Sequence, residues 1–565
     1  MSQADKSEHW KSKLGVILAV SGAAVGFGNF LRFPGLASEY GGAAFMVAYF
    51  ASFFLLGIPL AWLEWSIGRH GGQLNAHSAV GVYHKITRNK TTWKIFGIVS
   101  IMVTLGIAMY YIYLEAWALG YAYHTLMGNL QLSSSAEFVQ FFNTFTGAGT
   151  NGAAFDLSKT SVLIFLLIAL VLNFIVIYRG LSKGIELFCK ICIPMLILCA
   201  VIILVRVLTL GTPDANYPNR NIDQALGYMW NPDRVMLQAT IDGKNKTLDM
   251  LPAGSTPAQE AQLIADVQAQ YPKTEIRSVH ITFWQGLMNP ELWLAAAGQV
   301  FYTLSFGQAV ILGYASYVRK EQDIALSGIS AAAINELAEV GLAGMIIVPA
   351  ASAFLGVAAA AGCSTFGLGF NVLPQVFATM PGGQIFGFLF FLLLFIAAIS
   401  SSISFFIPTM TLVSDYIKMP RLMNIILTLS MILIGTAMVI WFTEDNFIAL
   451  DTIDSVVVTL GLFISTAGML YVGNKIWGTD NVISELRQAA LMRVPHALYY
   501  ILRYVTPSIL FVIVASWLYQ NIFVKVSDPI QRVLDLQLGA VLPLVWVFIL
   551  MVTFLIITTR KTPLE

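Results

Sequence analysis

Apolar stretches recur along nearly the whole chain, and they restrict its fold more than any other feature. Each has about 20 residues, enough to cross a hydrocarbon core of about 30 Å as an α-helix. With 57% hydrophobic and 11% charged residues and a mean hydropathy of +0.73, the composition lies far outside that of soluble domains. The sequence therefore predicts an all-α integral membrane protein with twelve spanning helices, at about residues 14–37, 43–68, 93–126, 160–178, 184–210, 291–318, 326–356, 383–416, 421–442, 449–476, 497–523 and 538–559.

Basic residues predict how these helices are oriented. An even number of spans puts both termini on one side of the membrane, and Lys and Arg gather in loops of one parity, which predicts that both termini are cytoplasmic. The first span is too long for the apolar region of a cleavable signal peptide. The basic residues that carry this bias include Lys6, Lys11, Lys13, Arg179, Lys183, Arg319, Lys320, Lys418, Arg421, Arg487, Arg493, Arg560 and Lys561.

Net charge and reactive side chains argue against several classes of function. The formal net charge of +1 gives no indication of a nucleic-acid partner. Three cysteines, Cys189, Cys192 and Cys199, lie in or near one apolar stretch and Cys363 lies alone, which favours packing over a disulfide or a metal site. The seven histidines are scattered without a metal or nucleophile pattern, so we expect no enzymatic activity.

One hydrophilic insert interrupts the series of spans. It covers residues 211–280, is shorter than a typical domain, and contains "STPAQEAQLIADVQAQY", which predicts a short amphipathic helix. The chain is therefore divided into residues 1–210 with helices 1–5, an external loop at 211–280, residues 281–476 with helices 6–10, and residues 477–565 with helices 11 and 12.

Two spans are interrupted by small and polar residues, the first at "SGAAVGFGN" and the sixth at "FYTLSFGQA". They lie five helices apart, which indicates an inverted repeat of five plus five helices with a binding site where the helices unwind near the bilayer midplane. Free carbonyls there suit Na⁺, and free amides suit a carboxylate. Taken alone, Gly22 and Gly26 are equally typical of a small-xxx-small packing face.

Several motifs in order resemble the neurotransmitter:sodium symporter family, in particular bacterial amino-acid transporters of the leucine transporter type. They include "AVSGAAVGFGNFLRFPGLASEYGGAAFMVAYF", "GIPLAWLEWSIGRHGG", "MYYIYLEAWALGY", "SKGIELFCKICIP", "GQVFYTLSFGQAVILGYASYV", "INELAEVGLAG" and "AAISSSISFFIP". The resemblance covers nearly all of the chain except about residues 237–281. It implies a sodium-coupled secondary active symporter that imports a neutral α-amino acid by alternating access in a bacterial inner membrane, and it leaves the choice between monomer and homodimer open.

The resemblance implies two sodium sites. The first corresponds to Ala24, Asn29, Thr303 and Asn335, completed by the carboxylate of the substrate itself. This shared shell is a physical reason for coupled binding. The second site corresponds to Gly22, Val25, Ala397, Ser400 and Ser401. A serine triplet alone is more typical of helix packing, and its pairing with the broken first helix favours the sodium site.

The resemblance also implies a substrate site between the two breaks. Relatives that carry biogenic amines have an Asp at the position of Gly26, so Gly26 favours a substrate with its own carboxylate. Gln308 indicates a polar or small substrate, or else it satisfies a neighbouring backbone group. The implied substrate residues are Ala23, Ala24, Gly26, Phe27, Gly28, Ile107, Tyr111, Phe301, Tyr302, Thr303, Ser305, Gln308, Ser401, Ser404 and Phe405.

Chloride-dependent relatives hold the anion at positions that correspond to Tyr49, Gln299 and Thr303, and at a fourth position this chain has Glu339. A carboxylate there would supply the negative charge that chloride supplies elsewhere. We therefore expect no chloride requirement. The residue either returns a proton or is a protonated structural group, and only the first alternative predicts a pH effect on turnover.

Two gates are implied by the resemblance. Arg32 and Asp454 match the outer ion pair, with Tyr111 and Tyr302 as an aromatic lid. Asp415 matches the acidic member of the inner pair, but its expected Arg partner is Ser7 here, which leaves Lys6 or no residue to pair with it. Gly184 and Pro194 reproduce a Gly-x9-Pro spacing that favours unwinding of helix 5. A non-transporting receptor and a channel remain the alternatives to a transporter.

Overall fold

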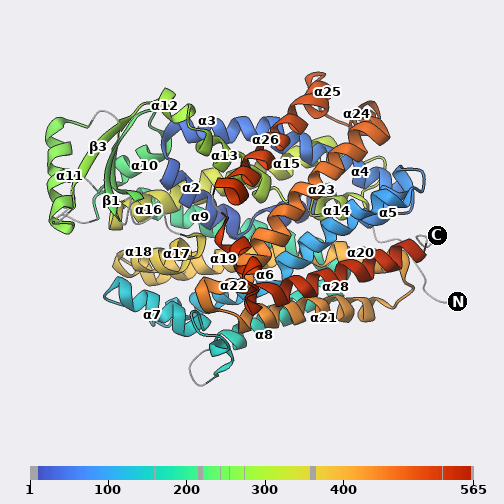
Figure 1. Ribbon diagram of the computed structural model, residues 1–565, viewed down its shortest axis with the longest axis horizontal. Coiled ribbons are helices and arrows are strands. Elements are labelled where there is room, and N and C mark those ends of the chain that lie inside the picture. Colours follow the sequence, from blue (N-terminus) through green and yellow to red (C-terminus); the bar gives the residue numbers. More distant parts are fainter. Residues whose placement is uncertain are drawn as a thin grey trace.

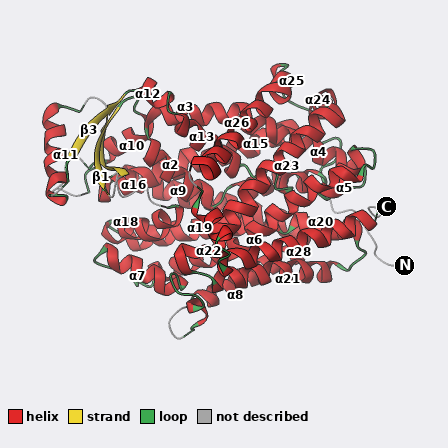
Figure 2. Ribbon diagram, in the orientation of Figure 1, coloured by secondary structure: helices red, strands yellow, loops and turns green. Residues whose placement is uncertain are grey.

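The protein is a bundle of long helices with a small three-stranded sheet at one end (Figures 1 and 2). The computed structural model describes residues 10–157, 161–213, 220–241, 244–252, 255–272, 274–356, 364–524 and 526–561. Cys363, Lys6 and Ser7, named above, lie outside the described residues.

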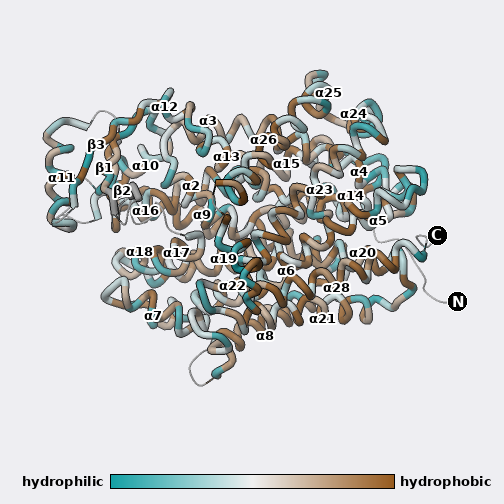
Figure 3. Tube along the Cα trace, in the orientation of Figure 1, coloured by the Kyte–Doolittle hydropathy of each residue, from teal (hydrophilic) through white to brown (hydrophobic). Residues whose placement is uncertain are grey.

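The longest helices are apolar along most of their length, as their brown colour in Figure 3 shows. Among the described residues, nine helices are long and apolar enough to cross a membrane, and one bent pair adds a tenth. This arrangement is that of a multi-pass membrane protein. The nine are Gly42–Gln73, Thr91–Leu126, Leu181–Leu208, Ile324–Leu355, Gly383–Tyr416, Arg421–Trp441, Phe447–Arg487, Ala497–Val524 and Leu538–Arg560.

Two of the twelve expected spans take a different form. The stretch expected at 160–178 contains a shorter apolar helix, Val162–Tyr178. The stretch expected at 291–318 is divided into Pro290–Thr303 and Val310–Ala315. The number twelve and the inverted repeat therefore stay predictions.

The helices follow one another along the chain in the order of their labels. They are α1 (Lys13–Ala24), α2 (Phe33–Tyr40), α3 (Gly42–Ser52), α4 (Ile58–Gln73), α5 (Ala79–Ile86), α6 (Lys94–Leu126), α7 (Ser135–Thr146), α8 (Val162–Tyr178), α9 (Glu186–Leu208), α10 (Ile222–Trp230), α11 (Pro257–Gln270), α12 (Phe283–Leu287), α13 (Pro290–Thr303), α14 (Val310–Ala315), α15 (Ile324–Glu336), α16 (Met345–Leu355), α17 (Thr365–Gly367), α18 (Leu373–Thr379), α19 (Gly383–Phe405), α20 (Ile407–Tyr416), α21 (Arg421–Trp441), α22 (Glu444–Thr452), α23 (Leu460–Tyr471), α24 (Thr479–Arg487), α25 (Ala497–Tyr500), α26 (Thr506–Leu518), α27 (Asp528–Leu534) and α28 (Leu538–Arg560).

The centre of the bundle is built on α6 and α19, which pack along one another. A buried polar network ties them to α8. Asn173 of α8 donates from its amide nitrogen to both oxygens of Glu115 on α6, at 3.0 and 3.1 Å, and accepts from the hydroxyl of Ser402 on α19 at 2.8 Å. Because polar groups at this depth have no water to bind, such bonds fix how the three helices pack.

The hydrophilic insert forms the sheet. Strands β1 (Arg234–Ile241), β2 (Lys244–Pro252) and β3 (Ile276–Ile281) pair antiparallel in the order β2-β1-β3. The expected amphipathic helix is confirmed as α11, whose start carries a capping box made by Thr256 and Gln259. Sheet and helix share a separate apolar core, which includes Val235, Leu237, Ala239, Leu248, Leu251, Leu263 and Val267.

Candidate functional site

The first candidate element is the break between α1 and α2. The two helices, with a π-helical turn at Gly28–Arg32 before α2, meet at an angle of 52°. The break frees backbone amides, and Asn29 binds one of them, since its Oδ1 accepts from the amide of Gly26 at 2.8 Å. The residue that follows the glycines in the sequence thus stabilises the break locally.

The second element is the break between α13 and α14. Residues 304–309 are not helical, and three of them, Ser305, Gly307 and Ala309, have left-handed backbone with φ of +58°, +69° and +59°. Glu64, fully buried on α4, accepts from the amides of Gly307 at 3.3 Å and Leu312 at 3.4 Å. Glu64 was not among the predicted site residues, although an acid within an apolar span is a signal for function.

An oxygen-rich cluster lies where the two breaks meet. The amide nitrogen of Asn29 lies 2.9 Å from the hydroxyl of Thr303 and 2.9 Å from Oδ1 of Asn335. It also lies 2.8 Å from the carboxylate of Glu339. These four side chains, from three separate parts of the chain, form what we call the first oxygen cluster. Three of them are residues predicted for the first sodium site.

Glu339 is the acidic member of this cluster. Its carboxylate is fully buried and also accepts from the hydroxyl of Thr303 at 2.6 Å and the amide of Gln299 at 2.7 Å. Gln299 and Thr303 are two of the three positions that correspond to a chloride site. The third, Tyr49, is fully buried against the ring of Phe33, with ring centroids 5.2 Å apart. A carboxylate thus occupies the surroundings predicted for the anion.

The residues predicted for the second sodium site also come together. The hydroxyl of Ser401 lies 3.2 Å from the carbonyl oxygen of Gly22, 3.0 Å from that of Val25 and 3.1 Å from that of Ala397. The hydroxyl of Ser400 donates to Ala397 at 3.0 Å. These five residues, from α1, the first break and α19, form the second oxygen cluster. Uncharged oxygens of this kind are ligands for a hard cation.

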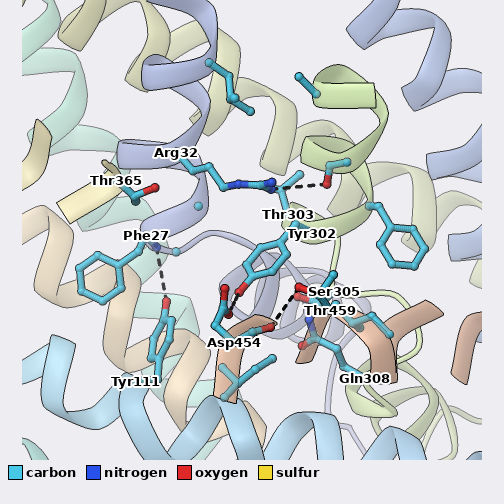
Figure 4. A pocket seen from close by; sticks show the side chains of 18 of the residues that line it. Phe27, Arg32, Tyr111, Tyr302, Thr303, Ser305, Gln308, Thr365, Asp454 and Thr459 are labelled. Carbon is cyan, nitrogen blue, oxygen red and sulfur yellow. Dashed lines mark hydrogen bonds between the residues drawn. The ribbon is translucent and has the colours of Figure 1, made fainter. Parts of the chain in front are cut away.

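A cavity of about 660 Å³, drawn in Figure 4, is lined by Thr303 of the first oxygen cluster and by Ser401 of the second. It is lined by every predicted substrate residue except one: Ala23, Ala24, Gly26, Phe27, Gly28, Ile107, Tyr111, Phe301, Tyr302, Thr303, Ser305, Gln308, Ser401 and Phe405. The exception is Ser404, which does not line the cavity and instead bonds the hydroxyl of Tyr314 at 2.8 Å and the carbonyl of Ser400 at 3.1 Å.

Gly26 lines this cavity close to Tyr111 and Ser401. A Cβ built there would lie 2.5 Å from the hydroxyl of Tyr111 and 3.1 Å from that of Ser401. The Tyr111 hydroxyl in turn accepts from the amide of Phe27 at 3.4 Å. Only glycine therefore leaves the break and the tyrosine in contact, because a side chain at this position would meet the hydroxyls of Tyr111 and Ser401.

Gln308 is the most unusual polar group of the cavity. Its side chain is 3% exposed, and its Oε1 is buried without a hydrogen-bond partner within the described parts of the chain. Its backbone carbonyl is satisfied by Thr104 at 3.0 Å, so the side chain is not needed for that role. Buried amides are normally paired, and Gln308, which lines the cavity, therefore keeps an unpaired acceptor within the described residues.

The two residues predicted to pair in the outer gate do not contact each other in this structure. Arg32 and Asp454 both line the cavity and make different contacts (Figure 4). The guanidinium of Arg32 lies over the ring of Tyr302 at 5.0 Å and donates to Gln299 at 3.2 Å. Asp454 accepts from the hydroxyls of Tyr302 at 2.6 Å and Tyr110 at 2.7 Å. The cavity therefore extends between the two charged residues.

The opposite end of α1 is closed. Trp10 is buried and donates from its indole nitrogen to the carbonyl of Tyr314 at 2.9 Å. Asp415, the predicted inner gate acid, caps α5: it accepts from the amide and hydroxyl of Ser78 at 2.8 and 2.6 Å and from the amide of His77 at 3.2 Å. Trp10 was not predicted for this role.

Comparison with known proteins finds relatives over most of the chain. An uncharacterized sodium-dependent transporter of Haemophilus influenzae is 26% identical over 74% of this chain and 77% of its own length. Another, of Methanocaldococcus jannaschii, is 25% identical over 85% of each chain. Among solved structures, MhsT in complex with L-phenylalanine is 25% identical with a TM-score of 0.68, over 90% of this chain and 99% of MhsT.

The broken helices, the two oxygen clusters and the cavity thus lie in a fold that is also seen in MhsT. The sequence profile of the Sodium:neurotransmitter symporter family matches residues 7–145 and 263–560, which is more than half of the chain. The unmatched residues include most of the insert, with strands β1 and β2 of its sheet. On this evidence the chain is a multi-pass membrane transporter that belongs to the sodium:neurotransmitter symporter family.

Proposed function

We propose that the protein imports a neutral α-amino acid together with Na⁺ by alternating access. The observation that carries the proposal is that both helix breaks meet at one cavity, with an oxygen cluster on either side. Backbone amides at such a break suit a carboxylate, and here side chains, Asn29 and Tyr111, accept from those of Gly26 and Phe27. MhsT, which shares the fold, was solved with an amino acid bound.

The first oxygen cluster supports coupling of Na⁺ to the substrate. Thr303 belongs both to this cluster and to the lining of the cavity, so a cation held there lies next to the place of the substrate carboxylate. Each ligand then raises the affinity for the other by the same factor. The second oxygen cluster, around Ser401, is the proposed place of a second Na⁺.

Glu339 supports chloride independence. Its carboxylate accepts from side chains on two sides, Asn29 on one and Gln299 on the other, as a bound anion would. A purely structural Glu339 predicts the same chloride independence without proton movement. A pH-sensitive dye inside the vesicles distinguishes the two alternatives, because only proton return on Glu339 changes the pH of the lumen during uptake.

The side chain of the substrate is proposed to be polar and uncharged. Gln308 lines the cavity, and its Oε1 is buried and unpaired within the described residues. A substrate hydroxyl or amide that donates to this oxygen removes the cost of an unpaired acceptor.

The open outer end and the covered inner end support an outward-facing state. Arg32 and Asp454 are apart while Trp10 is buried against Tyr314. We propose that both termini are cytoplasmic, as the basic loops predict, and that the protein lies in a bacterial inner membrane.

Uptake of a panel of labelled amino acids into proteoliposomes tests the proposal. An inward Na⁺ gradient is applied, with gluconate in place of chloride on both sides. Saturable accumulation that requires Na⁺ and persists in gluconate supports the symporter. Sodium-dependent binding without accumulation supports the receptor alternative, and flux that does not saturate supports the channel.

A further inference from the structure

A second cavity, of about 510 Å³, lies where the residues before α1 meet the turn between α8 and α9. Four basic residues line it: Lys11, Arg179, Lys183 and Lys190. We call it the basic pocket. It belongs to neither oxygen cluster and shares no residue with the central cavity.

The positive charge of the basic pocket is only partly compensated. Its single acid, Glu186, is bound by the ammonium of Lys190 at 2.6 Å, the hydroxyl of Ser12 at 2.9 Å and the amide of Lys11 at 2.9 Å. Across the described part of the chain, the side chains of Lys11, Arg179 and Lys183 make no ion pair or hydrogen bond. Three cations therefore converge without a partner.

A neutral donor and an apolar flank add to these cations. Ser182 lines the pocket, and its hydroxyl is buried without a hydrogen-bond partner among the described residues. On the adjoining surface of α9, Leu187 and Ile191 are 48% and 59% exposed, and Tyr178 at the end of α8 is 53% exposed. Such residues at the end of a spanning helix face lipid.

This combination has the chemistry of a lipid headgroup site. Clustered cations and a hydroxyl donor suit phosphate oxygens, apolar side chains beside them suit acyl chains, and basic pockets between helices at the cytoplasmic surface recognise anionic headgroups. We propose that the basic pocket binds the phosphate of an anionic lipid.

The bound lipid has a conformational consequence. Lys11 comes from the segment that carries Trp10, whereas Arg179 and Lys183 come from the turn before α9. A phosphate between them joins the two segments. It therefore favours the conformation in which Trp10 is packed against Tyr314, because a ligand shifts an equilibrium by its differential affinity for the two states.

Native mass spectrometry of the protein from nanodiscs that contain phosphatidylglycerol and phosphatidylcholine tests the binding. The test variant is Arg179→Gln with Lys183→Gln, and the control is Arg319→Gln with Lys320→Gln, which removes the same charge from exposed positions elsewhere. We expect retention of phosphatidylglycerol to fall on the order of ten-fold in the test variant only. Equal retention in both variants, or an equal loss in both, would overturn the proposal.

Hydrogen exchange tests the consequence and identifies the source of the phosphate. Amides of residues 10–24 should exchange more slowly in phosphatidylglycerol nanodiscs than in phosphatidylcholine nanodiscs, and the test variant should lose the difference. If glycerol phosphate gives the same protection in pure phosphatidylcholine nanodiscs, the pocket binds a soluble phosphate, and the proposal of a lipid ligand is overturned. Exchange that does not respond to phosphatidylglycerol overturns the conformational effect.

Discussion

Replacement of Gln308 by Leu is the most direct test of what the central cavity selects. Leu has a similar size and removes both the donor and the acceptor of the amide. The neighbouring backbone stays bonded, because Thr104 binds the carbonyl of Gln308 and not its side chain. The perturbation is therefore confined to the side-chain amide of Gln308, a residue that lines the cavity.

The magnitude follows from the burial of that group. Gln308 is 3% exposed and its Oε1 has no partner in the described residues. A buried acceptor left unpaired costs about 1–3 kcal/mol, which is a factor of about 5 to 150 in transport efficiency. Threonine and valine have nearly the same shape and differ by one hydroxyl donor. The native protein should therefore prefer threonine to valine by about this factor.

The assay is competitive sodium-driven uptake of labelled threonine and valine into proteoliposomes. In Gln308→Leu the ratio should fall to one or below, because an apolar pocket no longer offers the hydroxyl a partner. Gln520→Leu is the matched control. Gln520 lines the outer part of the same cavity and is exposed, so the same substitution there should leave the ratio unchanged.

The reasoning is refuted if the native protein transports both substrates equally well. It is also refuted if Gln308→Leu transports them with the native ratio. If neither substrate nor any other amino acid is accumulated, the proposed function fails as a whole, and this outcome is distinct from a wrong assignment of the side-chain preference.

Three further predictions concern the clusters and the closed inner end. Glu339→Ser removes the buried charge of the first oxygen cluster, so uptake in gluconate should fall at least about ten-fold, and chloride should restore part of it. Ser401→Ala removes a hydroxyl that touches three carbonyl oxygens, so the Na⁺ concentration for half-maximal uptake should rise about five-fold or more. Trp10→Ala deletes a buried ring and its bond to Tyr314, which costs about 3–5 kcal/mol of the closed inner conformation. A cysteine substituted for Ala24 should then react faster with a thiol reagent that is added from the cytoplasmic side.

Each of these has an outcome that contradicts it. Uptake by Glu339→Ser that is low in both anions would show that the carboxylate does not stand in for chloride. An unchanged Na⁺ dependence in Ser401→Ala would remove the second oxygen cluster from the coupling. Unchanged labelling after Trp10→Ala would mean that the ring does not hold the inner end closed; Trp284→Ala, at an exposed tryptophan, is the control.

The sequence predicted the membrane class and the site best where the signal is local. Apolar runs correspond to long apolar helices, and the glycines and polar residues of the first and sixth spans correspond to the two breaks. The residues placed by resemblance, such as Asn29 and Ser401, lie in two compact clusters. Local composition is enough for the breaks, because their glycines and polar residues lie in short stretches, whereas the members of each cluster come from distant parts of the chain and were placed by the resemblance.

Features that depend on distant contacts were missed. Glu64 binds amides more than 240 positions further along the chain, and no local pattern predicts which amides an acid will meet. Ser404 follows Ser401 by three positions on α19, and helix rotation turns it toward Tyr314. The β1 and β2 strands had a local signal, since Asp242 and Gly243 between them form a dipeptide typical of hairpins.

The left-handed residues of the sixth span have a consequence for energetics. A left-handed conformation costs a residue other than glycine about 1–2 kcal/mol, and Ser305 and Ala309 both adopt it. The packing of the folded bundle offsets this cost and maintains the irregular backbone. Because the sixth span is already unwound before a substrate binds, binding does not have to supply the free energy of unwinding. The binding site is therefore preorganised, in the sense used for enzymes and antibodies.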